Sequence, residues 1–183
     1  AYDNNNNSQA LKFFKSSKYL IKQHNSYLES YIYSLVLEGK VQRATSEIKK
    51  NSTEGNSNFF EAHLLLALDS LKRKNYKKSK EHLDKSYEFI KNDRFSLIIA
   101  ETLKQYLYVF EENKISKTRN KFGNFSLINQ VFQKCYLNDQ NTETYFNQLV
   151  NSQSDVDYTR YIFFYLNYLI ENNQYKEAKN ITD

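Results

Sequence analysis

The stretch "FFEAHLLLALDSLKRKNYKKSKEHLDKSYEFI", residues 59–90, decides the fold. Its first half, residues 59–74, is almost continuously apolar on one side, as is typical of a helix packed into a core. Asn75 indicates a turn, and residues 76–90 place apolar side chains at helical spacing with lysines between them. Two amphipathic helices joined by a tight turn form a helical hairpin, so this stretch predicts a helix pair.

The same pattern extends outward over nearly the whole chain. Apolar residues recur at helical spacing in further segments, which predict helices at residues 10–24, 27–38, 41–50, 95–112, 125–137, 142–150, 158–172 and 175–181. The polar opening "AYDNNNNSQ" (residues 1–9) predicts a non-helical start with a helix cap at Ser8. Proline is absent and glycine occurs three times, so the chain lacks the residues that β-hairpin turns require. The sequence therefore predicts an all-α fold without a β-sheet.

The excess of basic over acidic residues gives the chain a formal charge of +5, which suits an anionic partner such as nucleic acid. Lysine and asparagine are favoured by AT-rich codons, however, so their numbers alone are weak evidence. The basic stretches "LKRKNYKKSK" (residues 71–80) and "KISKTRNK" (residues 114–121) are expected on the exposed sides of a helical turn and a loop. We therefore keep a nucleic-acid-binding helical repeat only as a distant alternative.

A single cysteine, Cys135, excludes an intrachain disulfide framework and a cysteine-based zinc cluster. Its apolar neighbours at helical spacing predict a buried thiol rather than a nucleophile. No apolar run approaches the length of a membrane span, so we expect a soluble chain. The chain starts at Ala1 and stops inside a predicted helix, so we expect a fragment of a longer protein. The compartment stays open: the cytoplasm or, if a leader was removed, the periplasm.

No constellation of catalytic or metal-binding residues stands out. The chain has no glycine-rich phosphate loop, no His-Glu-x-x-His, no paired cysteines and no Gly-x-Ser-x-Gly. His63 lies near Glu61 and Asp69 but has no partner at ligand spacing, so we expect it to be a packing residue. His24 and His82 are expected to be solvated on polar faces. We therefore expect no enzyme, no cofactor and no metal site.

Three segments share one frame, in which a turn and an apolar or aromatic residue are followed three positions later by a small residue. The segments are "LEGKVQRATSEI" (37–48), "LKRKNYKKSKEHL" (71–83) and "IENNQYKEAKNI" (170–181). With the N-terminal helix included, the small residues are Ala10, Ala44, Ser79 and Ala178. Their successive spacings are 34, 35 and 99 residues, and the last equals three units of 33. A preserved spacing of this kind predicts a repeat.

This spacing resembles the tetratricopeptide repeat family, as found in bacterial helical repeat proteins, whose period is 34 residues. In such a unit, small residues lie where the two helices cross, because a short side chain lets the backbones approach. The best match is residues 59–89, where the family's core positions hold Leu66, Ala67, Tyr76, Ser79, Leu83 and Ser86. The family's helix-ending proline is absent throughout. A different solenoid of helical pairs and a generic helical bundle stay open as alternatives.

The resemblance implies one repeat domain over residues 1–183, an α–α superhelix (a solenoid) of antiparallel helix pairs. The better-matched units cover residues 8–22, 26–58, 59–92 and 158–183, and degenerate units cover residues 93–157. It also implies that Ala44, Ser79 and Ala178 are each buried at a helix crossing.

In tetratricopeptide proteins, outward positions of each unit's first helix line a concave groove that contacts a partner. Carried over to this chain, those positions are Glu29, Tyr33, Val36, Leu64, Leu68, Leu71, Leu103, Leu107 and Phe110. We expect Tyr33, Leu68 and Leu107 to form one stripe across neighbouring units. Family members that clamp a terminal carboxylate use Lys and Asn there, which this chain lacks, so the implied occupant is an amphipathic helix or an apolar peptide. The alternative for the leucines is packing against a neighbouring helix.

The resemblance thus implies a scaffold that binds a protein partner in an apolar groove. The alternative is a self-assembling structural subunit, because a solenoid open at both ends can stack on copies of itself and form a homo-oligomer.

Overall fold

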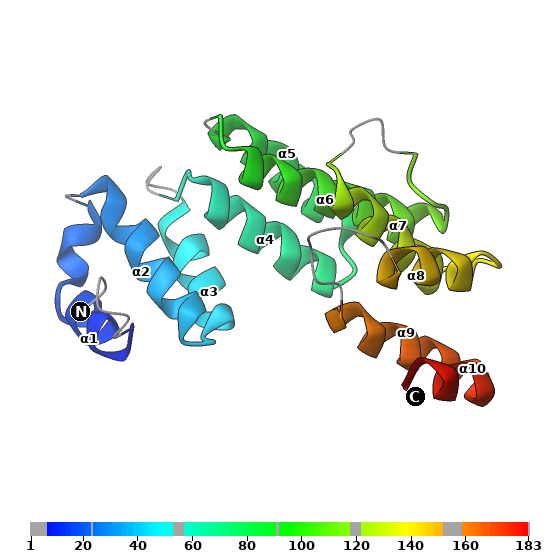
Figure 1. The fold of residues 1–183 in the computed structure, drawn as a ribbon. Coiled ribbons are helices and arrows are strands. Elements are labelled where there is room, and N and C mark those ends of the chain that lie inside the picture. Colours follow the sequence, from blue (N-terminus) through cyan, green and yellow to red (C-terminus); the bar gives the residue numbers. More distant parts are fainter. Residues whose placement is uncertain are drawn as a thin grey trace. The chain divides into compact units, whose positions relative to one another are not determined.

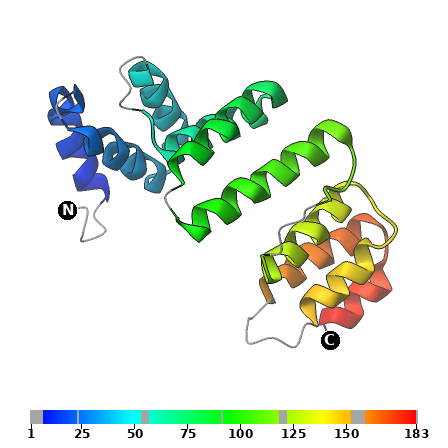
Figure 2. The same ribbon diagram turned by 90° about the horizontal axis from the view of Figure 1, so that it is seen from above.

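The computed structural model describes residues 7–22, 24–52, 57–90, 92–117, 122–151 and 159–182 (Figures 1 and 2). The helices are α1 (Asn7–Ser16), η1 (Lys18–Lys22), α2 (Asn25–Leu37), α3 (Val41–Asn51), α4 (Phe60–Lys72), α5 (Tyr76–Ser86), η3 (Tyr87–Phe89), α6 (Arg94–Glu112), α7 (Asn124–Tyr136), α8 (Thr142–Val150), α9 (Thr159–Glu171) and α10 (Tyr175–Thr182). No strand forms within the described residues, which confirms the predicted all-α fold for that part of the chain. Nor does any helix within it combine the length and apolarity needed to cross a membrane.

The N-terminal region differs from its prediction. The sequence predicts one helix over residues 10–24, but α1 ends at Ser16 and the 3₁₀ helix η1 follows. The Ser16 hydroxyl donates to the carbonyl oxygen of Phe13 at 2.9 Å, a local bond that competes with continuation of the helix. Ser8, the predicted cap, lies inside α1. Of the predicted opening and loops, residues 1–6, 53–56, 118–121 and 152–158 lie outside the described residues.

Four helix pairs, α2–α3, α4–α5, α7–α8 and α9–α10, are joined by the same kind of turn. Two residues after each first helix, the backbone adopts the left-handed conformation, with φ of +70° at Gly39, +58° at Lys74, +51° at Asn138 and +60° at Asn173. In each turn the next N–H donates to a carbonyl oxygen five residues back, which is the Schellman closure of a helix. This closure reverses the chain, so the second helix of each pair packs beside the first.

The chain divides into two compact units, Ala1–Leu107 and Tyr108–Asp183, with the boundary inside α6. In the first unit, one apolar core lies between α2, α3 and the N-terminal half of α4. Its fully buried members from α2 and α3 are Leu28, Tyr31, Ile32, Leu35, Ala44 and Ile48. Leu11 of α1, Ile21 of η1, and Ala62 and Leu66 of α4 also belong to this core. The α4 helix therefore packs on the preceding pair.

A second apolar core of the first unit lies on another side of α4. Here Phe60 and Ala67 of α4 pack against Leu83 of α5. The side chains that α6 contributes are Ala100, Leu103 and Leu107. Because α4 is covered on two sides, only narrow strips of its surface stay accessible to a partner.

The second unit has its own core, formed by α7 to α10, which gather into a compact group (Figure 2). Phe146 of α8 stacks on Tyr165 of α9, with ring centroids 4.9 Å apart and planes 13° from parallel. Between the pairs α4–α5 and α9–α10, residues 93–157 contain the long helix α6 and one pair, α7–α8.

The small residues of the predicted frame are buried. Ala44 and Ser79 are fully buried and Ala178 is 8% exposed, which confirms their predicted burial. Ser79 of α5 also donates its hydroxyl to the carbonyl oxygen of Ala67 on α4 at 2.7 Å. The serine therefore fills the place of closest approach and bonds across it.

Candidate binding groove

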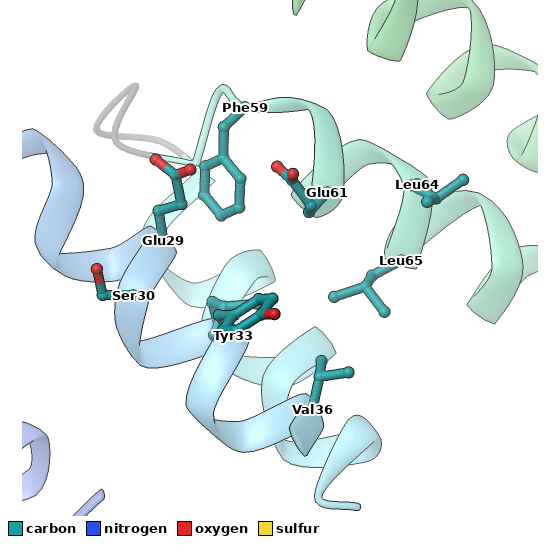
Figure 3. A pocket seen from close by; sticks show the side chains of 9 residues that line it. Glu29, Ser30, Tyr33, Val36, Phe59, Glu61, Leu64 and Leu65 are labelled. Carbon is teal, nitrogen blue, oxygen red and sulfur yellow. The ribbon is translucent and has the colours of Figure 1, made fainter. Parts of the chain in front are cut away.

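A groove opens between α2 and α4 in the first unit (Figure 3). Its lining residues are Glu29, Ser30, Ile32, Tyr33, Val36, Phe59, Glu61, Leu64 and Leu65. Four of the nine predicted groove residues are among them: Glu29, Tyr33, Val36 and Leu64. The structure thus brings together predicted residues from the first helices of two consecutive pairs. We call this surface the α2/α4 groove.

The spacing of residues along α2 explains which of its side chains line the groove. Buried residues of α2 recur so that one side of the helix enters the core with Leu28 and Leu35. Glu29, Tyr33 and Val36 follow one another at i, i+4 and i+7, so they lie on successive turns of a neighbouring side. That side faces α4, where Leu64 and Leu65 line the opposite wall (Figure 3).

The groove is mainly apolar and partly open to solvent. It encloses about 370 Å³, which lies at the small end of the range of roughly 300–1,000 Å³ for ligand sites. Tyr33 keeps 48% of its surface exposed although most of its neighbours in the groove are apolar. The polar lining consists of Ser30 and the carboxylates of Glu29 and Glu61, and no cationic side chain is among the described residues that line it.

Leu68 lies on a different surface. It is 43% exposed and lines a second groove, which runs between α3 and α4 and which we call the α3/α4 groove. The lining residues of the α3/α4 groove are Val41, Gln42, Thr45, Ser46, Lys49, Leu65, Leu68, Asp69, Lys72 and Arg73. Tyr33 and Leu68 therefore do not share one stripe, because α4 packs on both α2 and α3 and separates the two grooves.

The α3/α4 groove is charged. Lys49 bonds to one oxygen of Asp69 at 2.6 Å, and Arg73 bonds to the other at 3.1 Å. The hydrogen bond from Lys49 holds the pKa of the Asp69 carboxyl below its usual value, with Arg73 acting in the same direction. Lys72 adds a third cation to this groove.

The other four predicted residues lie outside both grooves. Leu103 and Leu107 are buried in the core that α4 shares with α5 and α6, and the half-buried Leu71 packs against that core. Phe110 packs edge-to-face on Tyr136 of α7, with ring centroids 4.8 Å apart. For Leu71, Leu103 and Leu107 the structure shows packing against neighbouring helices, whereas Leu64 and Leu68 line grooves.

Five lining residues of the α2/α4 groove were not predicted from the sequence: Ser30, Ile32, Phe59, Glu61 and Leu65. Glu61 precedes Leu64 by three residues, so the same-side rule for helices could have found it. Phe59 precedes α4 and enters the groove from a non-helical position, which no helical spacing indicates.

The two histidines of the α4–α5 pair pack together. His63 is 8% exposed and stacks on Phe89, and its ring centroid lies 6.2 Å from that of the half-buried His82. The predicted packing role of His63 is confirmed, whereas the prediction that His82 is solvated is wrong, because α5 turns its ring toward His63. Burial is the main cause that lowers the pKa of both imidazoles, so both are neutral at pH 7.

The described residues contain no group of three or more His, Cys, Asp or Glu side chains that could hold a metal ion. Cys135 is half-buried rather than fully buried, and burial raises the pKa of its thiol. A protonated thiol is a poor nucleophile, so Cys135 has the character of a packing residue.

Comparisons of the chain with protein-family models, with curated proteins and with solved structures found no match. The resemblance to tetratricopeptide repeats therefore rests on the sequence alone: the spacing of Ala10, Ala44, Ser79 and Ala178, and the core positions of residues 59–89.

Proposed function

We propose that this chain is a protein-interaction module, built as a solenoid of tetratricopeptide-like helix pairs, that holds an amphipathic helix of a partner in the α2/α4 groove. The observation that carries the proposal is the half-exposed Tyr33 in a mainly apolar groove. Tyrosine is enriched among the residues that dominate binding energy, because its ring buries a large area and its hydroxyl tolerates water. An exposed aromatic ring with apolar neighbours is better stabilised when a partner covers it.

The length of the groove fits a short helical contact. From Glu29 to Val36 the α2 wall runs two helical turns, or roughly 10 Å at 1.5 Å per residue. A partner helix laid along it presents anchors at i, i+3 or i+4, and i+7 over the same length. Two or three apolar anchors therefore suffice to cover Tyr33, Val36 and Leu65.

The proposal is tested by measuring whether peptides that bind the chain lose affinity when the groove is altered. Helical peptides displayed on phage are first selected for binding to the intact chain. Fluorescence anisotropy then measures their affinity for the parent and for Tyr33→Ala. We expect Tyr33→Ala to weaken binding by about 2 kcal/mol, roughly 30-fold, as for a central anchor. Tyr175→Ala is the matched control, because Tyr175 is 61% exposed on α10 and lies outside the groove. Equal affinity of the selected peptides for Tyr33→Ala and the parent contradicts the proposal.

Self-association is a second candidate function, which one observation favours. Phe163 and Ile170 of α9 are 64% and 49% exposed, and they lie seven residues apart on one side of the helix. A second copy of the chain presents the same two side chains, and in a two-fold symmetric dimer the same surface of each copy forms the interface. Sedimentation velocity would show a mass above 21.9 kDa that falls to the monomer value in Phe163→Lys. A monomer at all concentrations contradicts this candidate.

A further inference from the structure

Two carboxylates mark one end of the α2/α4 groove. Glu29 of α2 and Glu61 of α4 lie on either side of the Phe59 ring (Figure 3). Both side chains are exposed, and neither forms an ion pair with a residue that the structure describes. By contrast, Glu47 and Asp69 of the same unit are bonded to lysines at 2.7 and 2.6 Å. Among the described residues, therefore, no cation pairs with either carboxylate of the groove.

The rest of the groove becomes apolar along its length. On α2, Tyr33 and then Val36 follow Glu29 on successive turns. On α4, Leu64 and Leu65 lie one turn after Glu61. Both walls thus change from acidic to apolar in the same order, and Figure 3 shows Tyr33, Leu65 and Val36 beyond the two carboxylates. The groove has an acidic end and an apolar end.

We infer that the occupant is a cationic amphipathic helix, with Lys or Arg at the acidic end of the groove and apolar anchors one to two turns away. This inference deepens, and rests on, the proposed function. The cation would bond to Glu29 and Glu61, and the anchors would cover Tyr33 and Val36. Arg suits the acidic end best, because its planar fork can bond to carboxylates in pairs.

The charge of the occupant follows from desolvation. A helix lying in the groove removes water from Glu29 and Glu61, and a carboxylate that loses water without gaining a partner opposes binding. A cation on the occupant offsets this loss, whereas an acidic side chain at the same place adds repulsion. The acidic end therefore selects against neutral and acidic helices that have the same apolar anchors.

The α3/α4 groove provides the opposite selection. Its lining contains three cations, Lys49, Lys72 and Arg73, against the single carboxylate of Asp69. A cationic helix is repelled there and attracted to the α2/α4 groove on the other side of α4. Charge therefore directs the same apolar anchors to one of two adjacent grooves.

The experiment uses a helical peptide library randomised on one side and displayed on phage. It is selected against the intact chain with soluble Tyr33→Ala variant as competitor, so that groove-dependent binders are enriched. We expect Lys or Arg to be enriched three to seven residues from the apolar anchors. For a labelled selected peptide, Glu29→Gln and Glu61→Gln should each weaken binding about two- to fivefold, as expected for exposed ion pairs. The effect should shrink at high salt.

Controls separate charge from fold and from the proposed function. Glu111→Gln removes an exposed carboxylate of α6 outside the groove and should leave the affinity unchanged. Replacing the peptide's cation by Glu should weaken binding to the parent, and Glu29→Lys should restore it. If the enriched peptides are neutral or acidic and bind both Gln variants as tightly as the parent, the inference is wrong. The proposed binding in the α2/α4 groove would not be affected by that result. The absence of any Tyr33-dependent peptide would overturn the proposed function and the inference together.

Discussion

The two grooves that flank α4 differ in charge although they share one helix wall. The α2/α4 groove takes Glu61 and Leu64 from α4, whereas the α3/α4 groove takes Leu68 and Asp69. Leu65 lines both grooves. Since each residue advances about 100° around a helix, neighbouring residues of α4 reach different partners. The run of apolar residues in α4 is therefore divided among two cores and two grooves.

This division gives each leucine of α4 a different energetic role. Leu66 is 6% exposed and belongs to the core with α2 and α3, whereas Leu68 is 43% exposed. Leu64 is half-buried between the α2/α4 groove and the core with α5 and α6. Substitutions at neighbouring positions should therefore have very different effects, which the following experiments measure.

The largest effect is expected for Leu66→Glu. The new carboxylate enters a core with no cationic partner among its described members, so the free energy of unfolding should fall by about 3 kcal/mol or more. Leu66→Ala separates packing from charge and should lower it by roughly 2–5 kcal/mol through the cavity alone. Urea denaturation measures both. A Leu66→Glu protein as stable as the parent contradicts the assignment of Leu66 to the core.

The next largest effect is expected for Ser79→Phe, on the side of α4 that faces α5. Ser79 is fully buried and bonds to Ala67, so a phenyl ring has no room and should lower the free energy of unfolding by roughly 1–3 kcal/mol. Ser79→Ala keeps the size of the site and loses only the hydrogen bond, for about 1 kcal/mol. If Ser79→Phe melts like the parent, the closest approach of α4 and α5 lies elsewhere.

The turns of the first two helix pairs should respond in opposite directions. Lys74 is left-handed, which is unfavourable for a residue with a Cβ, so Lys74→Gly should raise the free energy of unfolding by up to about 1 kcal/mol. Gly39→Ala introduces the same strain at φ +70° and should lower it by about 1 kcal/mol. No atom would lie within 4 Å of the added Cβ at Gly39, so the effect reports backbone strain. Equal shifts of the same sign would rule out this explanation.

His63 and His82 should make the folded state less stable at acidic pH but not at neutral pH. Burial lowers both pKa values from 6.5, so the folded state binds protons less readily than the unfolded state. The contribution of the neutral imidazoles to the free energy of unfolding is fully present above about pH 6.5. It is lost as the pH falls toward the lowered pKa values of the folded state. The charged side chains that act on the pair are Lys49, Lys78, Glu81, Lys85 and Glu88.

His63→Phe should reduce this acid destabilisation, because it removes one of the two buried imidazoles. Thermal melts between pH 5 and pH 8 measure it. An unchanged acid profile in His63→Phe would show that the histidine pair is not its source.

The smallest effect is expected for Leu68→Glu. Leu68 shares the partly open α3/α4 groove with Lys72 and Asp69, so the free energy of unfolding should stay within about 0.5 kcal/mol of the parent's. Binding of a peptide in the α2/α4 groove should also be unchanged. A large drop in stability would place Leu68 in a core and would remove the distinction between the two leucines.

Much of the fold could be predicted from the sequence because helices depend on local spacing. The helix pairs, their turns and the burial of Ala44, Ser79 and Ala178 all follow from periodicity and from small residues at a fixed frame. The break after Ser16 was missed, because a helical pattern of apolar residues continues across it while the local serine bonds favour termination.

The candidate site was predicted only in part. Four of the nine proposed residues, Glu29, Tyr33, Val36 and Leu64, line one groove. Leu103 and Leu107 have the same apolar character in the sequence but are covered by α4 and α5. A sequence shows that a side chain is apolar, and it does not show which neighbour covers it.

By itself, the sequence determined the helices, their turns and the small residues at which α4 and α5 meet, because these depend on residues a few positions apart. The tertiary structure decided which leucines of α4 are core and which are surface, and it separated Tyr33 from Leu68. It also brought Glu29 and Glu61, 32 residues apart along the chain, into one groove on either side of Phe59. The physical reason is that burial depends on how far one helix rotates against its neighbours, which is set by the packing of all the side chains between them.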